Sequence, residues 1–213
     1  MRLHRLIAIA VLALAGAASG AAMDRAQALA ALSHSEVQQR LAGVQRLAEI
    51  GTMDDADRLI GTLDDADAPM RAVTAAAVWR IWSRSGDAAI DTLFARGIEQ
   101  MESAQLNDAL LTFNEIVRRK PAFAEGWNKR ATIYFLLGRH TESLQDCDEV
   151  LKRNRNHFGA LSGAGQIHLQ LGNAQEALDF FRRAVDVNPA LEGPASMIPL
   201  LEQVLRDKGR KAI

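Results

Sequence analysis

Apolar residues recur at helical spacing through two neighbouring stretches of the chain, 124–137 and 141–153. Between the two stretches, Gly138, Arg139 and His140 interrupt the apolar pattern. The sequence therefore predicts two helices joined by a tight turn. One such hairpin cannot bury both of its apolar faces, so it needs neighbouring hairpins to stack against.

The same order of large, small and apolar residues returns 34 positions later in the chain. One copy comprises Trp127, Ala131, Tyr134, Gly138, Ser143, Cys147 and Val150, and the next comprises Leu161, Gly165, His168, Gly172, Ala177, Phe181 and Ala184. A looser copy lies 34 positions upstream and includes Leu93, Gly97, Ala104, Ala109 and Phe113. Three hairpins are therefore expected, at about 90–123, 124–157 and 158–191.

Small residues and turn residues fix how these hairpins pack and end. Ala131 and Gly165 occupy equivalent positions, where a small side chain lets two helices approach closely. Asn173 and Glu176 predict a capping box for the helix that follows Gly172. Pro189, after Asn188, closes the last repeat. An amphipathic helix at 194–208 then covers the apolar face that this repeat would expose.

The 34-residue spacing, together with the residues at those positions, resembles the tetratricopeptide repeat (TPR). The resemblance covers about 89–207 and implies an all-α, right-handed solenoid of stacked antiparallel hairpins. It also implies a binding scaffold, without naming the ligand. The clearest departure from the family is Arg155, which stands where a proline is expected between repeats.

A second internal similarity, with a period of 31, precedes the repeats. Residues 33–36 match 64–67, and Arg40 matches Arg71. This pattern looks like short HEAT-type repeats and assigns 23–86 to a HEAT-like segment and 87–213 to the TPR domain. Trp79 and Trp82 lie on a helix that is apolar over most of its circumference, which predicts deep packing. Because the apolar pattern resumes directly after Gly86, one continuous superhelix is expected.

Residues 1–22 have the pattern of a secretory signal peptide: basic residues, an apolar run from Leu6 to Ala15, and then small residues. The run is shorter than the roughly 20 apolar residues of a spanning helix. We therefore expect export to the periplasm or beyond, with no stable membrane insertion after cleavage. The chain has a single cysteine, Cys147, which excludes an intramolecular disulfide.

Charge and motifs argue against several other classes of function. The formal net charge is −1, with no basic excess of the kind that nucleic-acid binding requires. The chain has no nucleophile elbow, phosphate-binding loop or zinc-protease motif, so we expect neither an enzyme nor a cofactor.

Metal binding is also the weaker interpretation of the candidate ligands. The segments 51–57 and 61–67 are rich in aspartate, but they lack the glycine and distal glutamate of an EF-hand loop. Helix capping accounts for these aspartates. His168 and Cys147 occupy repeat positions held elsewhere by Tyr134 and Phe113, which favours packing roles over metal or redox chemistry.

In TPR proteins the first helix of each hairpin lines a concave groove, and the resemblance carries those positions onto this chain. The candidate groove residues are Phe94, Ile98, Met101, Asn128, Lys129, Thr132, Phe135, Ser162, Gln166, Leu169 and Gln170. With a single lysine among them, they do not resemble a chaperone-type carboxylate clamp. They better suit an amphipathic helix or an extended apolar peptide. The alternative for the apolar members is that they pack against neighbouring helices.

The sequence therefore predicts an exported helical-repeat scaffold that binds another protein or a peptide through the TPR groove. Self-association through the concave face, without a peptide ligand, stays open as a structural role. A metal-binding or enzymatic protein is the remaining alternative, and it would have to assemble its site from residues such as His168 or Cys147.

Overall fold

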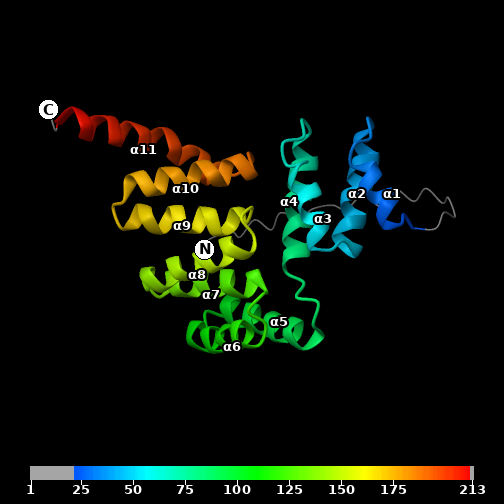
Figure 1. Ribbon diagram of the computed structural model, residues 1–213, viewed down its shortest axis with the longest axis horizontal. Coiled ribbons are helices and arrows are strands. Elements are labelled where there is room, and N and C mark those ends of the chain that lie inside the picture. The colour runs from blue at the N-terminus through cyan, green and yellow to red at the C-terminus, as the bar shows by residue number, and fades with distance from the viewer. Residues whose placement is uncertain (1–21, 212–213) are drawn as a thin grey trace, which may run out of the picture.

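The structure, a computed structural model, describes residues 22–211, and every regular element in this range is a helix (Figure 1). The helices are α1 (Arg25–Ala31), α2 (Val37–Ile50), α3 (Met53–Ile60), α4 (Ala68–Trp82), α5 (Ala88–Glu102), α6 (Leu106–Arg119), α7 (Ala124–Leu136), α8 (His140–Arg153), α9 (Phe158–Gln170), α10 (Ala174–Val187) and α11 (Glu192–Lys211). The predicted all-α solenoid class is confirmed. The signal peptide predicted at 1–22 lies, apart from Ala22, outside the described residues.

Helices α5 to α10 form three antiparallel hairpins that stack side by side (Figure 1). Each hairpin turns at a residue with positive φ: Ala104 (56°), Gly138 (71°) and Gly172 (76°). These residues are 34 positions apart, so the degenerate first copy turns at the same point as the other two. Glycine adopts this left-handed backbone readily, whereas alanine at Ala104 pays a steric penalty.

Small and large residues are matched between the two helices of each hairpin. A Cβ atom built at Gly97 would lie 2.6 Å from the ring of Phe113, and one at Gly165 would lie 2.6 Å from the ring of Phe181. Both rings are almost fully buried. The helix backbones therefore approach closely because the first helix carries no side chain at this point. In the middle hairpin the pair is Ala131 and Cys147: Ala131 is larger than the glycines at its position, and Cys147 is smaller than the phenylalanines at its position.

The capping box predicted for α10 does not form. Asn173 is the residue before α10, but no side-chain hydrogen bond caps this helix. The Asn173 amide nitrogen instead lies 3.4 Å from Nδ1 of His168, in the preceding helix. At the end of the solenoid, α11 packs on α10 and buries Leu201 against Ala177 and Phe181. The covering helix predicted at 194–208 thus runs from Glu192 to Lys211.

Helices α1–α4, here called the N-terminal unit, have their own core. Leu47, Leu59, Met70 and Ile81 are among its fully buried side chains. The two arginines of the 31-residue similarity make equivalent contacts with the turns before their helices: Arg40 donates to the carbonyls of residues 34 and 35, and Arg71 donates to those of residues 65 and 66.

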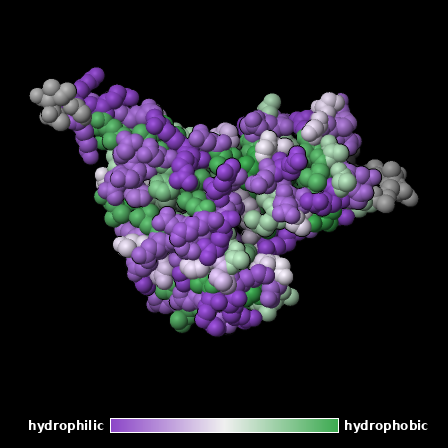
Figure 2. All heavy atoms as spheres, viewed as in Figure 1, coloured by the Kyte–Doolittle hydropathy of each residue, from purple (hydrophilic) through white to green (hydrophobic). Residues whose placement is uncertain are grey.

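The expected continuous superhelix is wrong, because the N-terminal unit lies beside the repeats (Figures 1 and 2). Trp82 stacks on His157, with ring centroids 4.4 Å apart and an interplanar angle of 18°. Trp79 meets His157 and Phe158 edge-on at 5.3 and 5.2 Å. Residue Phe158 thereby joins the core of the N-terminal unit. Trp82 is buried and Trp79 is partly buried, and the partners of both come from the start of α9.

None of the helices within residues 22–211 combines the length and apolarity needed to cross a membrane.

Candidate functional site

The first helices of the hairpins, α5, α7 and α9, carry the predicted groove residues. Between α7, α8 and α9 the structure has a cavity of about 150 Å³ that is open to solvent. Its walls are Asn128, Ala131, Thr132, Phe135, Ser143, Cys147, Gly159, Gly163, Gln166 and Ile167. Four of the predicted groove residues thus come together here: Asn128, Thr132, Phe135 and Gln166. The others lie outside this cavity.

The cavity exists because two small residues face each other across it. Gly163 leaves its position on α9 empty, and a Cβ atom built there would have Cys147 Sγ, at 3.9 Å, as its nearest neighbour. Cys147 holds the repeat position that Phe113 and Phe181 fill with buried rings. The middle hairpin therefore lacks the aromatic ring that closes this space in the hairpins on either side.

Most of the cavity wall is apolar, with amide groups at its edge. Burial raises the pKa of the Cys147 thiol to about 12, and the negative charges of Asp146 and Asp148 act in the same direction. The thiol is therefore neutral and contributes as an apolar group. Gln166 is exposed at the edge, where its amide can donate to and accept from a bound backbone.

A buried polar network closes one end of the groove. Nε2 of His157 lies 2.9 Å from Glu125, and the Asn128 amide donates to both oxygens of the same carboxylate at 3.2 and 3.1 Å. Lys129 Nζ lies 3.0 Å from Glu125 and 5.5 Å from the centroid of the Trp79 ring. Lys129 is thus already paired, and it is not presented as a free cation to a ligand.

Opposing effects set the ionisation of Glu125. Burial by itself would raise the pKa of this carboxyl, but the hydrogen bond from His157 and the charge and hydrogen bond of Lys129 outweigh burial and hold the pKa below its usual range. Nδ1 of His157 accepts the backbone N–H of Ala160 at 3.1 Å, so Nε2 carries the proton that points at Glu125. The hydrogen bond between Glu125 and His157 therefore joins the start of α7 to the residue before α9.

The predicted anchors on α5 belong to the interior of the first hairpin. Phe94 is 8% exposed and packs edge-on against Phe113 and Phe123, with centroids 5.8 and 5.4 Å away. Ile98 and Met101 are partly buried against the same cluster. The prediction that Phe94 presents a surface to a ligand is wrong. The packing alternative that the sequence left open describes these three residues.

The remaining groove candidates are scattered on α9. The Ser162 hydroxyl donates to the carbonyl of Phe158 at 2.8 Å. Leu169 packs partly buried against the core beneath α11, and Gln170 is exposed at the end of α9.

The repeat positions lie at the contacts between helices. Trp127 donates its indole N–H to the carbonyl of Pro121 at 2.9 Å, and the guanidinium of Arg153 lies 4.8 Å above its ring. Tyr134 lies under the guanidinium of Arg139, at 4.5 Å. The other repeat positions are occupied as follows: Ala131, Leu161, Ala177 and Phe181 are buried, His168 stacks on Phe180 at 5.5 Å, and Pro189 lies in the turn after α10.

Ala131, Ser143, Cys147 and Ile167 also line the cavity, a role that was not predicted from the sequence. A signal for it was present, because Cys147 replaces an aromatic residue at its repeat position and Gly163 lies one helical turn before Ile167. Within the part of the chain that the structure describes, no group of three or more His, Cys, Asp or Glu side chains could hold a metal ion.

Comparisons with known proteins agree with this architecture. Residues 123–190 match the family described as Tetratricopeptide repeat. A TPR repeat-containing protein of Rhizobium etli is 33% identical over 162 residues, which cover 76% of this chain and 79% of that protein.

Two solved structures show the same fold. The first TPR of Spaghetti (RPAP3), bound to an HSP90 peptide, superposes with a TM-score of 0.53 at 20% identity, covering 55% of this chain and 93% of the other. MamA protein gives a TM-score of 0.53 at 18% identity, covering 78% and 87%. With helix hairpins at a 34-residue period and a relative matched over most of its length, this chain belongs to the tetratricopeptide-repeat family.

Proposed function

We propose that this protein is a scaffold that binds a peptide segment of another protein in the groove formed by α7 and α9. The observation that carries the proposal is the cavity of about 150 Å³ in the groove, with apolar walls and amide groups at its edge. One apolar side chain of a bound peptide would fill the cavity. Gln166 would hydrogen-bond to the peptide backbone, and the side-chain oxygen of Asn128, whose amide nitrogen donates to Glu125, would accept a peptide N–H.

Two further features support a binding role over a catalytic one. The cavity is lined by groups without acid, base or nucleophilic function at neutral pH, because the Cys147 thiol is protonated. A fold neighbour, the first TPR of Spaghetti, was solved with an HSP90 peptide bound. In this chain Lys129 is paired with Glu125, so the ligand proposed here is an apolar segment rather than an acidic chain terminus.

We propose further that the protein acts outside the cytoplasm, in the periplasm or beyond. The support is the leader pattern of residues 1–22, with its apolar run from Leu6 to Ala15. Cell fractionation of the producing organism, together with N-terminal sequencing of the isolated protein, tests this proposal. A full-length chain in the cytoplasm would contradict it.

Filling the cavity from within tests the binding site directly. Gly163→Leu places a side chain in the space that the peptide would use, whereas Gly163→Ala adds only a Cβ atom that has room. Random peptides displayed on phage would be selected on the native protein, and their affinities for the three proteins measured by fluorescence anisotropy. We expect binding to weaken at least about tenfold in Gly163→Leu, corresponding to loss of one buried apolar side chain, and to persist in Gly163→Ala.

Thermal unfolding of all three proteins would establish that each variant is folded. Peptides that bind native and Gly163→Leu proteins equally, or a selection that enriches no sequence, would refute the groove as the binding site.

Self-association is the second candidate function, and one observation favours it. On the outer face of α11, Leu200 is 59% and Val204 45% exposed, and apolar spheres gather along this helix (Figure 2). Sedimentation of native protein and of Leu200→Gln/Val204→Gln would distinguish the roles. A dimer that the double variant abolishes would support self-association through α11, whereas a monomeric native protein would exclude it at the concentrations used.

A further inference from the structure

Helix α11 repeats the orientation that α7 and α9 have in the stack of hairpins (Figure 1). Ile133 of α7, Ile167 of α9 and Leu201 of α11 are 34 positions apart, and each is at most 3% exposed. Each of them belongs to a core cluster that it shares with the hairpin before it. Helix α11 therefore has the place of the first helix of a fourth repeat, and its other faces follow the same register.

Two groove positions are exposed on each of these three helices. They are held by Thr132 and Leu136 on α7, Gln166 and Gln170 on α9, and Leu200 and Val204 on α11. Within each pair the residues are four positions apart, so they lie on one face of their helix. The exposed pair on α11 thus continues the row that begins on α7, and the groove surface extends over α9 onto α11.

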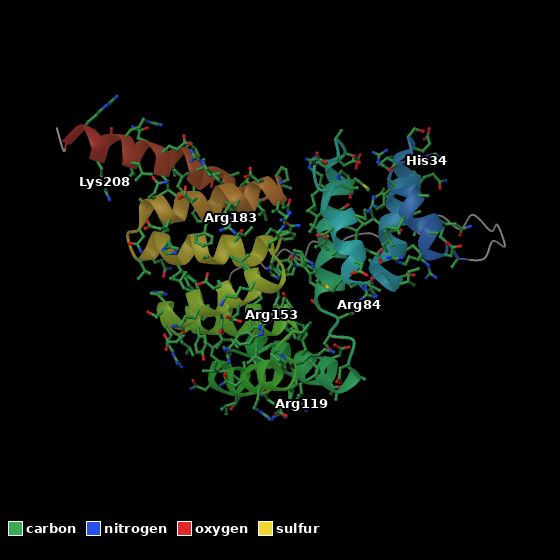
Figure 3. All side chains as sticks on the ribbon, viewed as in Figure 1. His34, Arg84, Arg119, Arg153, Arg183 and Lys208 are labelled. Atoms are coloured by element: carbon green, nitrogen blue, oxygen red, sulfur yellow. The ribbon has the colours of Figure 1, made fainter. Side chains whose placement is uncertain are left out.

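The chemistry of this surface changes from one helix to the next. The cavity of about 150 Å³ between α7 and α9 has apolar walls, α9 presents two amides, and α11 presents Leu200 and Val204, which are 59% and 45% exposed. None of the six exposed groove residues is charged. Of the basic residues labelled in Figure 3, Arg183 lies on α10 and Lys208 near the free end of α11, so neither belongs to this row. The surface therefore matches a ligand with two apolar groups and an uncharged polar part between them.

The two amides on α9 favour an extended ligand over a helical one. An extended segment leaves its backbone N–H and C=O groups unpaired, and the side chains of Gln166 and Gln170 can both donate to and accept from such groups. A helix pairs its backbone groups internally and needs only apolar contacts from a groove. The glutamines therefore lie where an extended backbone would cross α9.

The spacing of the helices sets the distance between the two apolar groups of the ligand. Packed helices lie roughly 8–10 Å apart, and the cavity is half a spacing before α9, so the exposed pair on α11 lies roughly 12–15 Å from the cavity. An extended chain advances about 3.3 Å per residue, so about four residues cover this distance. Residues i, i+2 and i+4 of an extended chain point to the same side, which places both apolar groups and the polar one on the groove.

We propose that α11 is part of the peptide site and that the bound segment is extended. One apolar side chain enters the cavity beside Gly163, and a second, four residues away, packs against Leu200 and Val204. An uncharged polar side chain between them faces Gln166 and Gln170. This rests on the peptide groove proposed above, and it adds the conformation of the ligand and a second anchor.

Peptide selection gives the first test. Random dodecapeptides displayed on phage and selected on the full chain are expected to converge on two apolar residues four positions apart. Convergence on apolar residues seven or eight positions apart, as on one face of a helix, would overturn the extended conformation.

Substitutions on α11 test the second anchor. Leu200→Gln/Val204→Gln is expected to weaken the best selected peptide about tenfold in fluorescence anisotropy, the loss of one buried apolar side chain. Leu111→Gln is the matched control, because Leu111 is 68% exposed on α6, outside the groove. This control is expected to change the affinity by less than about twofold. Thermal unfolding of each protein establishes that it is folded.

A double-mutant cycle assigns each peptide anchor to its place. Alanine at the anchor that contacts α11 should cost little further affinity in Leu200→Gln/Val204→Gln, because both changes remove the same contact. Alanine at the other anchor should show that non-additivity with Gly163→Leu instead.

The outcomes separate this proposal from the groove itself. Binding that Gly163→Leu weakens but Leu200→Gln/Val204→Gln leaves unchanged would overturn the second anchor and keep the groove. Loss of binding in the α11 variant alone would overturn both the two-anchor arrangement and the cavity as a site. A dimeric native protein that binds the peptide more weakly than a monomeric Leu200→Gln/Val204→Gln would assign the pair on α11 to a second copy, which also overturns the proposal.

Discussion

Two glycines on helix α9, two positions apart, are expected to respond to the same substitution with opposite signs. A Cβ atom at Gly165 would lie 2.6 Å from two ring carbons of Phe181, closer than the 3.0 Å that real Cβ contacts respect. At Gly163 the nearest atom would be Cys147 Sγ, at 3.9 Å, an ordinary van der Waals distance. Gly165→Ala should therefore destabilise the protein, and Gly163→Ala should stabilise it.

The magnitude follows from two terms. Alanine favours a helix interior over glycine by about 0.8–1 kcal/mol, and both variants gain this term. Only Gly165→Ala meets the Phe181 ring, which is 2% exposed and cannot swing into solvent; overpacking of this kind costs about 1–3 kcal/mol. Helix propensity and the effect on the unfolded chain cancel in the difference between the variants. That difference, about 1–3 kcal/mol, measures the contact alone.

Thermal and urea unfolding of the three proteins provide the assay. A difference of about 2 kcal/mol corresponds to roughly 4–8 °C between the variants' midpoints for a chain of this length. In the Phe181→Leu background the two alanine variants should move closer together, since the smaller side chain can give way. Equal stability of Gly163→Ala and Gly165→Ala would refute the close approach of α9 and α10 at this point.

Three more predictions concern single residues. Ala104→Gly should stabilise the protein by about 1 kcal/mol in chemical unfolding, because Ala104 adopts a left-handed φ of 56°; a loss of stability would contradict that turn geometry. Cys147, with its pKa raised to about 12, should react with a thiol reagent at pH 8 much more slowly in the folded protein than in the unfolded one, so equal labelling rates would contradict its burial. The pKa of Glu125 is depressed beside His157, so its contribution to stability is present above the ordinary value of 4.5 and is lost as pH falls through the lower folded value. In urea unfolding measured from neutral to acid pH, Glu125→Gln should remove this loss of stability. An unchanged dependence of the unfolding free energy on pH would contradict the assignment.

The local pattern of the repeats could be predicted because it depends on contacts between near neighbours in sequence. Helices expected at 124–137 and 141–153 run from Ala124 to Leu136 and from His140 to Arg153. The turn at Gly138 was marked by its residue type, since glycine favours positive φ. The 34-residue pattern occurs in three copies in this chain, so each copy supports the helix boundaries predicted for the others.

The position of the N-terminal unit could not be predicted in the same way. Trp79 and Trp82 indicate a buried helix, but a pattern of apolar residues does not say which surface covers it. The partner, Phe158, lies more than 70 residues further along the chain. Nor does helical spacing separate a groove anchor from a core residue, and Phe94 shows this ambiguity because its ring faces Phe113 and Phe123. The cavity beside Gly163 likewise could not be predicted from one helix, because it depends on the side-chain volumes at Gly163 and Cys147, which lie on different helices.

The pairing of small and large residues within each hairpin limits how the repeats can be recombined. Gly97 fits Phe113 and Gly165 fits Phe181, while Ala131 is matched to the smaller Cys147. A whole hairpin carries both halves of its own match, so duplication or exchange of complete hairpins preserves the close approach of the helices. A crossover at the turn would instead join Ala131 to an aromatic ring, or a glycine to Cys147, producing a steric clash in one product and a void in the other. The unit that can be recombined in this solenoid is therefore the whole hairpin. Recombination breakpoints between hairpins preserve the packing, whereas breakpoints inside a hairpin disrupt it.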